Sequence, residues 1–503
     1  MKKNIFISIL LIVIFASCKT LIARDMILTP AEKSSFREVS KYADIVTFIH
    51  DLDNSSSLLT VETIGHSVEG RNVYALKFST TTFGSDKSKI RVLIHAQQHG
   101  NEQSGKEGAL LIARELLKPE NRVIFDHIDL AIVPQVNPDG SEKNIRRNGN
   151  NVDLNRNHLI MTEPEVLALH KLFDKYLFEV TMDVHEYFPY SKEWERLGYR
   201  KNSDILLGFN THPLIPESIR EYQLKKCWPY LSSQLESKGV SNSIYSPGGP
   251  PEIDYVRFST FDINDGRQSF GIQNTFSFIQ EGLNGEDGYV ENLAHRAYFQ
   301  SQGIYFLLKY VSEHYIEIKS TVETLRRTQS LTESIIPLRM EHMPDGSKFN
   351  MPVYSYKTGK DSTLVVNDFR PKVVPTLTIQ RPSGYLFPKS DLKLIDWIIR
   401  QGYEITPFSV KNPIMEELYI KSIDSIDFER DIIAAANVEE KEIQKSSINI
   451  DDYIYVSTKQ LKGHLLIIGV EPQSELGIAT YPQFSYLMKA ESIYPVIRIR
   501  EKQ

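Results

Sequence analysis

Cysteine is scarce in this chain, because only Cys18 and Cys227 occur among its 503 residues. Two cysteines cannot form the dense disulfide framework that stabilises many small exported domains. Stability must therefore come from a sizeable hydrophobic core. We expect Cys227 to be a buried, small apolar side chain within that core rather than a reactive thiol.

An excess of positive charge is also missing. The chain has 58 lysines and arginines against 64 acidic residues, a net charge of -6 and a pI near 6.2. Nucleic-acid binding normally needs a basic surface, so no nucleic-acid partner is expected. The composition, 41% hydrophobic and 24% charged, is that of a globular protein. A chain of this length is longer than one hydrophobic core usually supports, and two folded domains are expected.

Long apolar runs are absent except at the N-terminus. Met1, Lys2 and Lys3 precede an apolar run over residues 5–16, which is typical of a secretory signal. The residues just before Cys18 resemble the lipobox of bacterial lipoproteins, although Phe15 is an untypical first residue for it. Residues 1–18 are therefore interpreted as a lipoprotein signal with Cys18 as the lipidated residue. The alternatives are an ordinary cleaved signal or an uncleaved anchor. We expect export and membrane attachment through the N-terminal lipid only.

Apolar, β-branched runs alternate with helical patterns in the first part of the chain. Residues 90–96, 128–134 and 180–184 read as buried strands, whereas residues 108–117 and 163–176 read as helices, the second with Thr162 as N-cap. This alternation predicts an α/β domain over residues 27–320, with a mixed, largely parallel sheet sandwiched by helices.

The rest of the chain has a different pattern. Short strands are expected near residues 353–356, 364–366, 464–468 and 494–497, with one clear helix over residues 390–402. A smaller, β-rich α+β accessory domain over residues 330–503 fits this pattern.

Four polar residues with metal-binding or acid–base chemistry follow predicted strands. His99 and Glu102 come after the strand of residues 90–96, His185 follows a strand that ends at Val184, and Glu281 follows one that ends at Gln280. Ligands gather at the carboxyl ends of parallel strands. Two histidines and a carboxylate leave the fourth position of tetrahedral zinc open, as in catalytic sites. Each residue alone would be an ordinary loop residue, so the combination carries the hypothesis.

Ordered motifs over residues 40–310 resemble the M14 zinc carboxypeptidases. The family's HxxE motif is matched by His99 and Glu102, its NPDG turn by residues 137–140, and its D-x-N-R-N stretch by residues 153–157, after Arg146. The segment 162–165, His185 and Glu281 then follow in the family's order.

The resemblance implies one Zn²⁺ ion held by His99, Glu102 and His185. It implies that Asp153 orients His99, since such a carboxylate fixes the tautomer of a ligating histidine. It also makes Glu281 the residue that takes a proton from water and passes it to the leaving nitrogen.

Substrate contacts follow from the same resemblance. Asn155 and Arg156 would hold the terminal carboxylate of a peptide, and Arg146 would polarise the scissile carbonyl. Arg147 is an alternative to Arg146 in this last role. The family's substrate-contacting tyrosine has two candidates here, Tyr255 and Tyr245, and either of them fits a packing role equally well.

Residues before Glu281 normally shape the pocket for the terminal side chain. Arg267 would favour an acidic side chain there, but pairing with Asp262 or Asp265 as a structural ion pair explains it as well.

The sequence therefore predicts a zinc carboxypeptidase that acts on peptides. One alternative is an amidase of the same family that acts on peptidoglycan stem peptides, because bacterial relatives of this compact kind include cell-wall peptide hydrolases. The other is a catalytically silent peptide-binding protein. The joint presence of all the predicted ligands and the base argues against that one. For the C-terminal segment we expect packing against the catalytic domain or shaping of substrate access.

Overall fold

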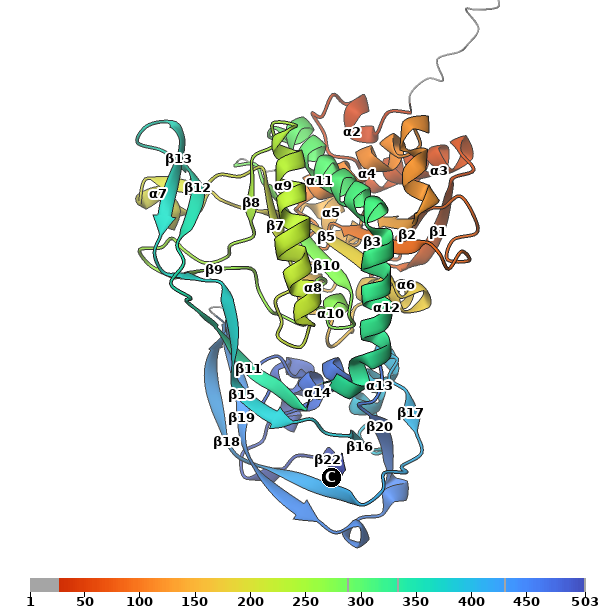
Figure 1. Cartoon of the computed structure of the whole chain (residues 1–503), viewed down its shortest axis with the longest axis vertical. Helices are drawn as coiled ribbons and strands as arrows, with labels where there is room; N and C mark the ends of the chain where they lie inside the picture. The colour runs from red at the N-terminus through yellow and green to blue at the C-terminus, as the bar shows by residue number, and fades with distance from the viewer. Residues whose placement is uncertain (1–26, 287–288, 333, 429–430, 502–503) are drawn as a thin grey trace, which may run out of the picture.

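The computed structural model describes residues 27–286, 289–332, 334–428 and 431–501. The predicted lipoprotein signal and Cys18 lie outside these residues. The first part of the chain forms the upper body in Figure 1, and most of the segment after helix α12 forms the lower one.

An eight-stranded sheet forms the centre of the first part, in the order β1-β2-β4-β3-β5-β10-β7-β8. Its inner pairs, β3 with β4, β3 with β5 and β5 with β10, are parallel, whereas β1 with β2, β2 with β4 and β7 with β10 are antiparallel. The strands are β1 (Leu59–His66), β2 (Asn72–Phe78), β3 (Ile90–Ala96), β4 (Ile128–Val133), β5 (Val180–Tyr187), β7 (Ile205–Gly208), β8 (Asn242–Ile244) and β10 (Phe276–Leu283).

Both faces of this sheet are covered by helices. Successive residues of the inner strands point to opposite faces, so each strand contributes to two cores. In β3, Val92 and Ile94 join the larger core cluster, and Leu93 joins a second cluster. Helices α4 (Gln103–Glu115) and α11 (Leu293–Glu313) contribute to the first cluster, and α6 (Pro164–Tyr176) contributes to the second. The predicted α/β class, with a mixed sheet between helices, is confirmed.

The segment after α12 (Tyr315–Thr332) is rich in strands, as predicted. Strands β16 (Gly384–Pro388), β17 (Ile405–Thr406), β18 (Pro413–Phe428), β19 (Asp431–Ile443), β20 (Tyr453–Ser457), β21 (Ser492–Ile493) and β22 (Ile497–Glu501) form a seven-stranded sheet. Strands β11 (Ile335–Met343) and β15 (Lys372–Gln380) form a separate pair. Helix α13 (Leu392–Gln401) lies within the predicted range 390–402.

The two parts share strands across the predicted boundary. Strand β12 (Phe349–Ser355), which also pairs with β13 (Lys360–Val366), adds β6 (Tyr199–Lys201), and β14 (Phe369–Arg370) pairs with β9 (Val256–Arg257). Trp397 on α13 donates its indole N–H to the carbonyl of Leu159. The C-terminal segment is therefore connected to the first part by two strand pairs and by side-chain hydrogen bonds.

Several local predictions are wrong. Of the strand predicted at residues 494–497, residues 494–496 lie between β21 and β22 and are not in a strand. Residues 464–468 lie in helix α14 (Gly463–Val470), all of whose residues are buried, and a short apolar run does not distinguish a buried strand from a buried helix. Residues 137–140 begin helix α5 (Pro138–Lys143), where Asn137 accepts the N–H of Gly140. Helix α6 has Glu163 rather than Thr162 at its N-cap, because the Thr162 hydroxyl accepts a hydrogen bond from Asn157.

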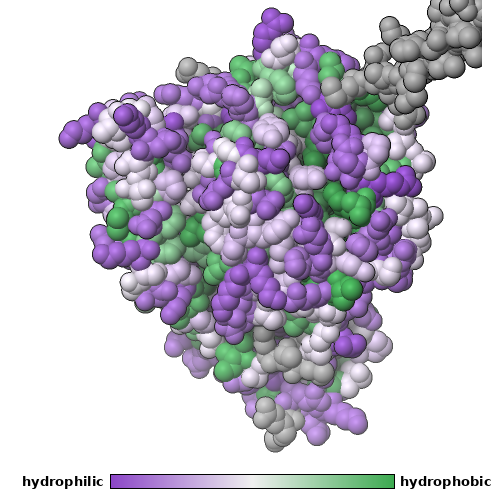
Figure 2. All heavy atoms as spheres, turned by 45° about the horizontal axis from the view of Figure 1, so that its top comes forward, coloured by the Kyte–Doolittle hydropathy of each residue, from purple (hydrophilic) through white to green (hydrophobic). Residues whose placement is uncertain are grey.

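Cys227 is a free, buried cysteine, as predicted. Among the described residues, no helix combines the length and apolar character needed to cross a bilayer. On the face drawn in Figure 2, hydrophobic residues are scattered between polar ones.

Candidate active site

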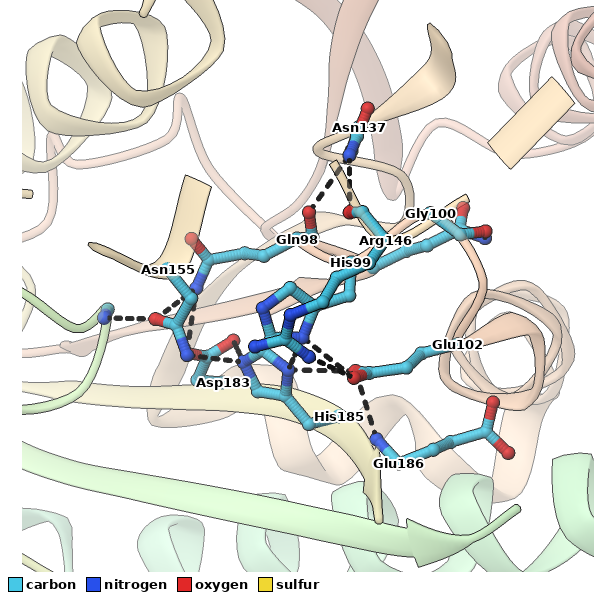
Figure 3. A network of polar contacts seen from close by, with 12 residues as sticks. Gln98, His99, Gly100, Glu102, Asn137, Arg146, Asn155, Asp183, His185 and Glu186 are labelled. Carbon is cyan, nitrogen blue, oxygen red and sulfur yellow. Dashed lines mark hydrogen bonds and ion pairs between the residues drawn. The ribbon is translucent and has the colours of Figure 1, made fainter. Parts of the chain in front are cut away.

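Three buried side chains converge at the carboxyl end of β3 and β5. His99 and Glu102 lie in the turn between β3 and α4, and His185 lies in β5 (Figure 3). Nδ1 of His99 is 2.7 Å from Oε1 of Glu102, and Nδ1 of His185 is 2.8 Å from Oε2 of the same carboxylate. The two Nδ1 atoms are 3.2 Å apart. One potential ligand atom from each residue lies within 4.8 Å of the other two, so a single cation can contact all three.

His185 and Glu281 lie inside strands and not after them, which corrects the predicted strand ends. Strand β5 continues to Tyr187 and β10 continues to Leu283. The two strands are parallel and place Glu281 directly beside His185. His185 and Glu281 are polar and line the cavity, and polar residues at these positions hide the strand signal in the sequence.

The turn that carries His99 and Glu102 is held by backbone packing against α5. A Cβ atom on Gly100 would lie 2.1 Å from the carbonyl carbon of Gly140, so only glycine fits there. Asn137 donates to the carbonyls of Gln98 and Arg146, and the N–H of Gly100 donates to the same Arg146 carbonyl. Two separate sequence motifs are thus one structural unit.

The charges of the cluster stabilise one another. Burial alone would raise the pKa of Glu102, but His99 and His185 outweigh it and hold that pKa well below its ordinary value. Burial would lower the pKa of His185, yet Asp183 and Glu102 raise it well above the usual range. A carboxylate shared by two imidazoles is therefore kept ionised.

Asp153 and Arg146 extend this network towards solvent. Oδ1 of Asp153 is 3.0 Å from Nε2 of His99, and its Oδ2 accepts Nε–H of Arg146 at 3.0 Å. Arg146 is half-exposed and lines the cavity, whereas Arg147 donates to the carbonyl of Asn151 and is not among the lining residues. Of the two arginines, Arg146 is thus the one that faces the cavity.

Asn155 and Arg156 also line the cavity, in different ways. Asn155 is buried, and its Oδ1 accepts the N–H of Gly266 at 2.7 Å. Arg156 has a half-exposed side chain that donates to the carbonyl of Asn155, with Nη2 3.9 Å from Oδ2 of Asp262. Of the pair, Arg156 has the more exposed side chain.

The cavity has a volume of about 390 Å³ and is rich in polar side chains. Glu281 lines it and is buried, which raises the pKa of its carboxyl to about 7 although His185 lowers it. Of the two candidate tyrosines, Tyr245 lines this cavity. Tyr255 lines a different cavity, and the guanidinium carbon of Arg370 lies over its ring, 3.8 Å from the ring centre.

Arg267 is fully buried and is absent from the cavity lining. Its Nη2 lies 3.1 Å from Oδ2 of Asp265, and the same guanidinium donates to Ser259 and Thr260. The structure therefore shows the ion pair that was the alternative interpretation of this arginine.

Two residues of the site were missed by the sequence analysis. Arg257 lines the cavity from β9, and no motif marks it. Asp183 lies beneath His185 on the same strand, and its position two residues before a candidate ligand would have been the available signal.

Residues 45–188 match the family model Peptidase_M14, described as zinc carboxypeptidase. Carboxypeptidase 2 of Trichophyton rubrum is 22% identical over 480 residues, which span 90% of this chain and 85% of that protein. Human carboxypeptidase D is 25% identical over 259 residues, 44% of this chain and 18% of that protein. A metallo-carboxypeptidase structure from Burkholderia cenocepacia aligns with a TM-score of 0.43 and 18% identity, over 55% of this chain and 71% of that one.

Proposed function

Because this chain belongs to the M14 zinc carboxypeptidase family and is a peptidase, we propose that it removes C-terminal residues from peptides by zinc-dependent hydrolysis. The observation that carries the proposal is the buried cluster of His99, Glu102 and His185 beside Glu281.

The donor set of this cluster fits zinc. Two neutral imidazoles and one carboxylate are the ligands of catalytic zinc in several peptidases, including carboxypeptidase A. Both histidines turn Nδ1 towards Glu102, so their Nε2 atoms are left for partners in the protein. When bound, one zinc ion would supply a Lewis acid that makes water acidic enough to lose a proton near neutral pH.

Glu281 is proposed as the general base. Its carboxylate would take the proton of the attacking water and deliver it to the leaving nitrogen of the peptide bond. Its burial holds the pKa near 7, which suits a group that must both accept and release a proton at neutral pH.

The arginines are proposed to bind and polarise the substrate. Arg146, held by Asp153, would donate to the scissile carbonyl as negative charge develops on its oxygen. The half-exposed head of Arg156 would bind the terminal carboxylate, for which a planar guanidinium offers two parallel hydrogen bonds. Asn155, which also lines the cavity, would complete this carboxylate site.

The location of the enzyme bears on its substrate. We propose that it is exported and anchored through Cys18, where it meets both protein fragments and peptidoglycan stem peptides. The cavity offers polar groups suited to a terminal carboxylate in either substrate. Assays on both kinds of substrate distinguish them.

The test is release of free amino acids from a mixed peptide pool and from murein fragments by the form that begins after Cys18. Release from peptides that a chelator stops would support the carboxypeptidase proposal. Release from murein fragments alone would transfer it to peptidoglycan. No release by zinc-loaded protein would favour a silent binding protein.

A further inference from the structure

Asp183 is a fully buried acidic residue in the centre of the main sheet. It lies on β5 between β3 and β10, where it pairs with His95 on one side and Ile279 on the other. Residues two apart in a strand face the same side, so Asp183 shares its side with His185. An ionised carboxylate in such a place is costly unless donors compensate it.

Nitrogen atoms and a glycine surround this carboxylate. Its Oδ1 lies 2.9 Å from Nε2 of His185 and 3.2 Å from Nδ1 of His95, and its Oδ2 accepts Nε2–H of Gln98 at 2.8 Å. A Cβ atom on Gly266 would lie 2.7 Å from Oδ2, so the backbone of Gly266 closes the pocket against it.

The two histidines of the cluster are placed alike. Each turns Nδ1 to Glu102 and Nε2 to an aspartate, His99 to Asp153 at 3.0 Å and His185 to Asp183 at 2.9 Å. A neutral imidazole carries one N–H, and a carboxylate at Nε2 keeps that hydrogen there. The lone pair of Nδ1 is then free for a metal.

Asn155 is the other polar group near Nε2 of His185, at 3.3 Å through its Nδ2 (Figure 3). The N–H of Gly266 donates to Oδ1 of Asn155, which assigns the amide nitrogen to the side of His185. An amide nitrogen donates and does not accept, so it cannot take the Nε2–H of His185. Oδ1 of Asp183 lies closer to Nε2, at 2.9 Å, and makes no hydrogen bond of its own among the described residues, so it is the acceptor atom available at that position.

We propose that Asp183 is a positioning residue for the metal, holding His185 in the tautomer that presents Nδ1 and strengthening it as a ligand. This inference rests on the proposed zinc site. It goes beyond that proposal because it names a residue that touches neither metal nor substrate.

The test is the zinc affinity of Asp183→Asn, measured by competition with a chromophoric chelator. Partners of this kind typically contribute 10- to 100-fold in metal affinity, and a loss in that range is expected. Asp129→Asn is the matched control: Asp129 is a buried strand carboxylate on β4 that accepts from Ser79 and Gly84, away from the site. A loss no larger than that of the control would overturn the proposal.

A crystal structure of the zinc-loaded wild-type protein tests the same inference without a variant that must fold. The expected result has Nδ1 of His185 on zinc and Nε2 within hydrogen-bond distance of Asp183. Zinc on Nε2 would overturn it. Peptide release is not read in either experiment, so an inactive protein that still binds zinc would contradict the proposed function alone.

Discussion

Glu281 shows how a single residue takes its chemistry from its surroundings. It lies inside β10 beside His185, and its burial, together with the nearby charges of Glu102 and Asp183, favours the protonated carboxyl. Glutamine in its place keeps the shape and removes the ability to accept a proton.

Glu281→Gln is expected to lower amino-acid release by about 10²- to 10⁴-fold, the usual contribution of a general base, without loss of bound zinc. Activity assays and metal analysis on the same sample check this. Glu323→Gln, at an exposed position on α12, serves as the control. A variant that keeps wild-type activity would remove Glu281 from the mechanism.

Glu475 supplies a prediction about pH and stability. Burial raises the pKa of its carboxyl to about 8, although the N–H of Met340 donates to it. In the unfolded chain the same group titrates near its ordinary value of about 4.3. The folded state therefore binds the proton more tightly, and this contribution to stability is complete below pH 4 and declines as pH rises to 8.

Glu475→Gln removes this titration and keeps an oxygen for the N–H of Met340. Between pH 5 and pH 8 the free energy of unfolding should change in favour of the variant, relative to wild type, by at least about 1 kcal/mol. Urea unfolding at both pH values measures it. An equal difference at both pH values would contradict the raised pKa.

At this scale the sequence predicts residues that belong to dense motifs. His99, Glu102, Asp153 and Asn155 stand in short motifs whose order is distinctive. Asp183 and Arg257 were missed because their roles depend on which strand lies beside which. The mistaken ends of β5 and β10 have the same origin, since polar residues at a strand end look like loop in the sequence.

Elements here are joined by close backbone contacts, as the turn of His99 and Glu102 shows. Gly100 lies against Gly140 of α5 with no space for a side chain, and Gly140 is in turn closed in by the carbonyl of Arg147. The cluster of His99, Glu102 and His185 therefore depends on the packing of a helix that contributes none of its three side chains.

Gly100→Ala is expected to cost more than about 3 kcal/mol of stability, since backbone cannot yield as a side chain can. Gly105→Ala is the control. Gly105 lies in helix α4, and a Cβ atom there would lie 3.2 Å from a methyl group of the Val184 side chain. Thermal unfolding compares the two variants. If both unfold at the temperature of the wild type, the contact between Gly100 and Gly140 has no importance for stability.

Element types were predicted well where the hydrophobic period was long and clear, as in the inner strands and α13. Helix α14 was missed because its run is apolar on every side and has no period. Asn137 was read as a turn residue, and it does end one segment, but its side chain caps a helix. The sequence thus indicates correctly that a segment ends at Asn137, but it does not predict that a helix begins there.

At the scale of the whole molecule, the C-terminal segment contacts the first part of the chain next to the site. Tyr481, from the C-terminal segment, donates to the carbonyl of Arg156 and accepts from Asn264. Strand β9, which carries Arg257 into the cavity, is paired by β14. The C-terminal segment thus contacts two stretches of the chain that line the cavity, the one with Arg156 and the one with Arg257.

A chain ending at Thr332 is expected to be much less stable than the full chain, because it leaves β6 and β9 unpaired and uncovers the core around Leu159. Thermal unfolding and size-exclusion chromatography of both forms check this. A truncated form that remains monomeric, stable and equally active would show that the C-terminal segment is dispensable.

The measurement that tests the central claim most directly is a zinc titration of the metal-stripped protein, followed by release of C-terminal residues from peptides. The account predicts no release without metal and a rise that reaches its plateau at one zinc per chain, with no such rise in His185→Ala. Full release from the stripped protein, or none at any zinc concentration, would contradict it.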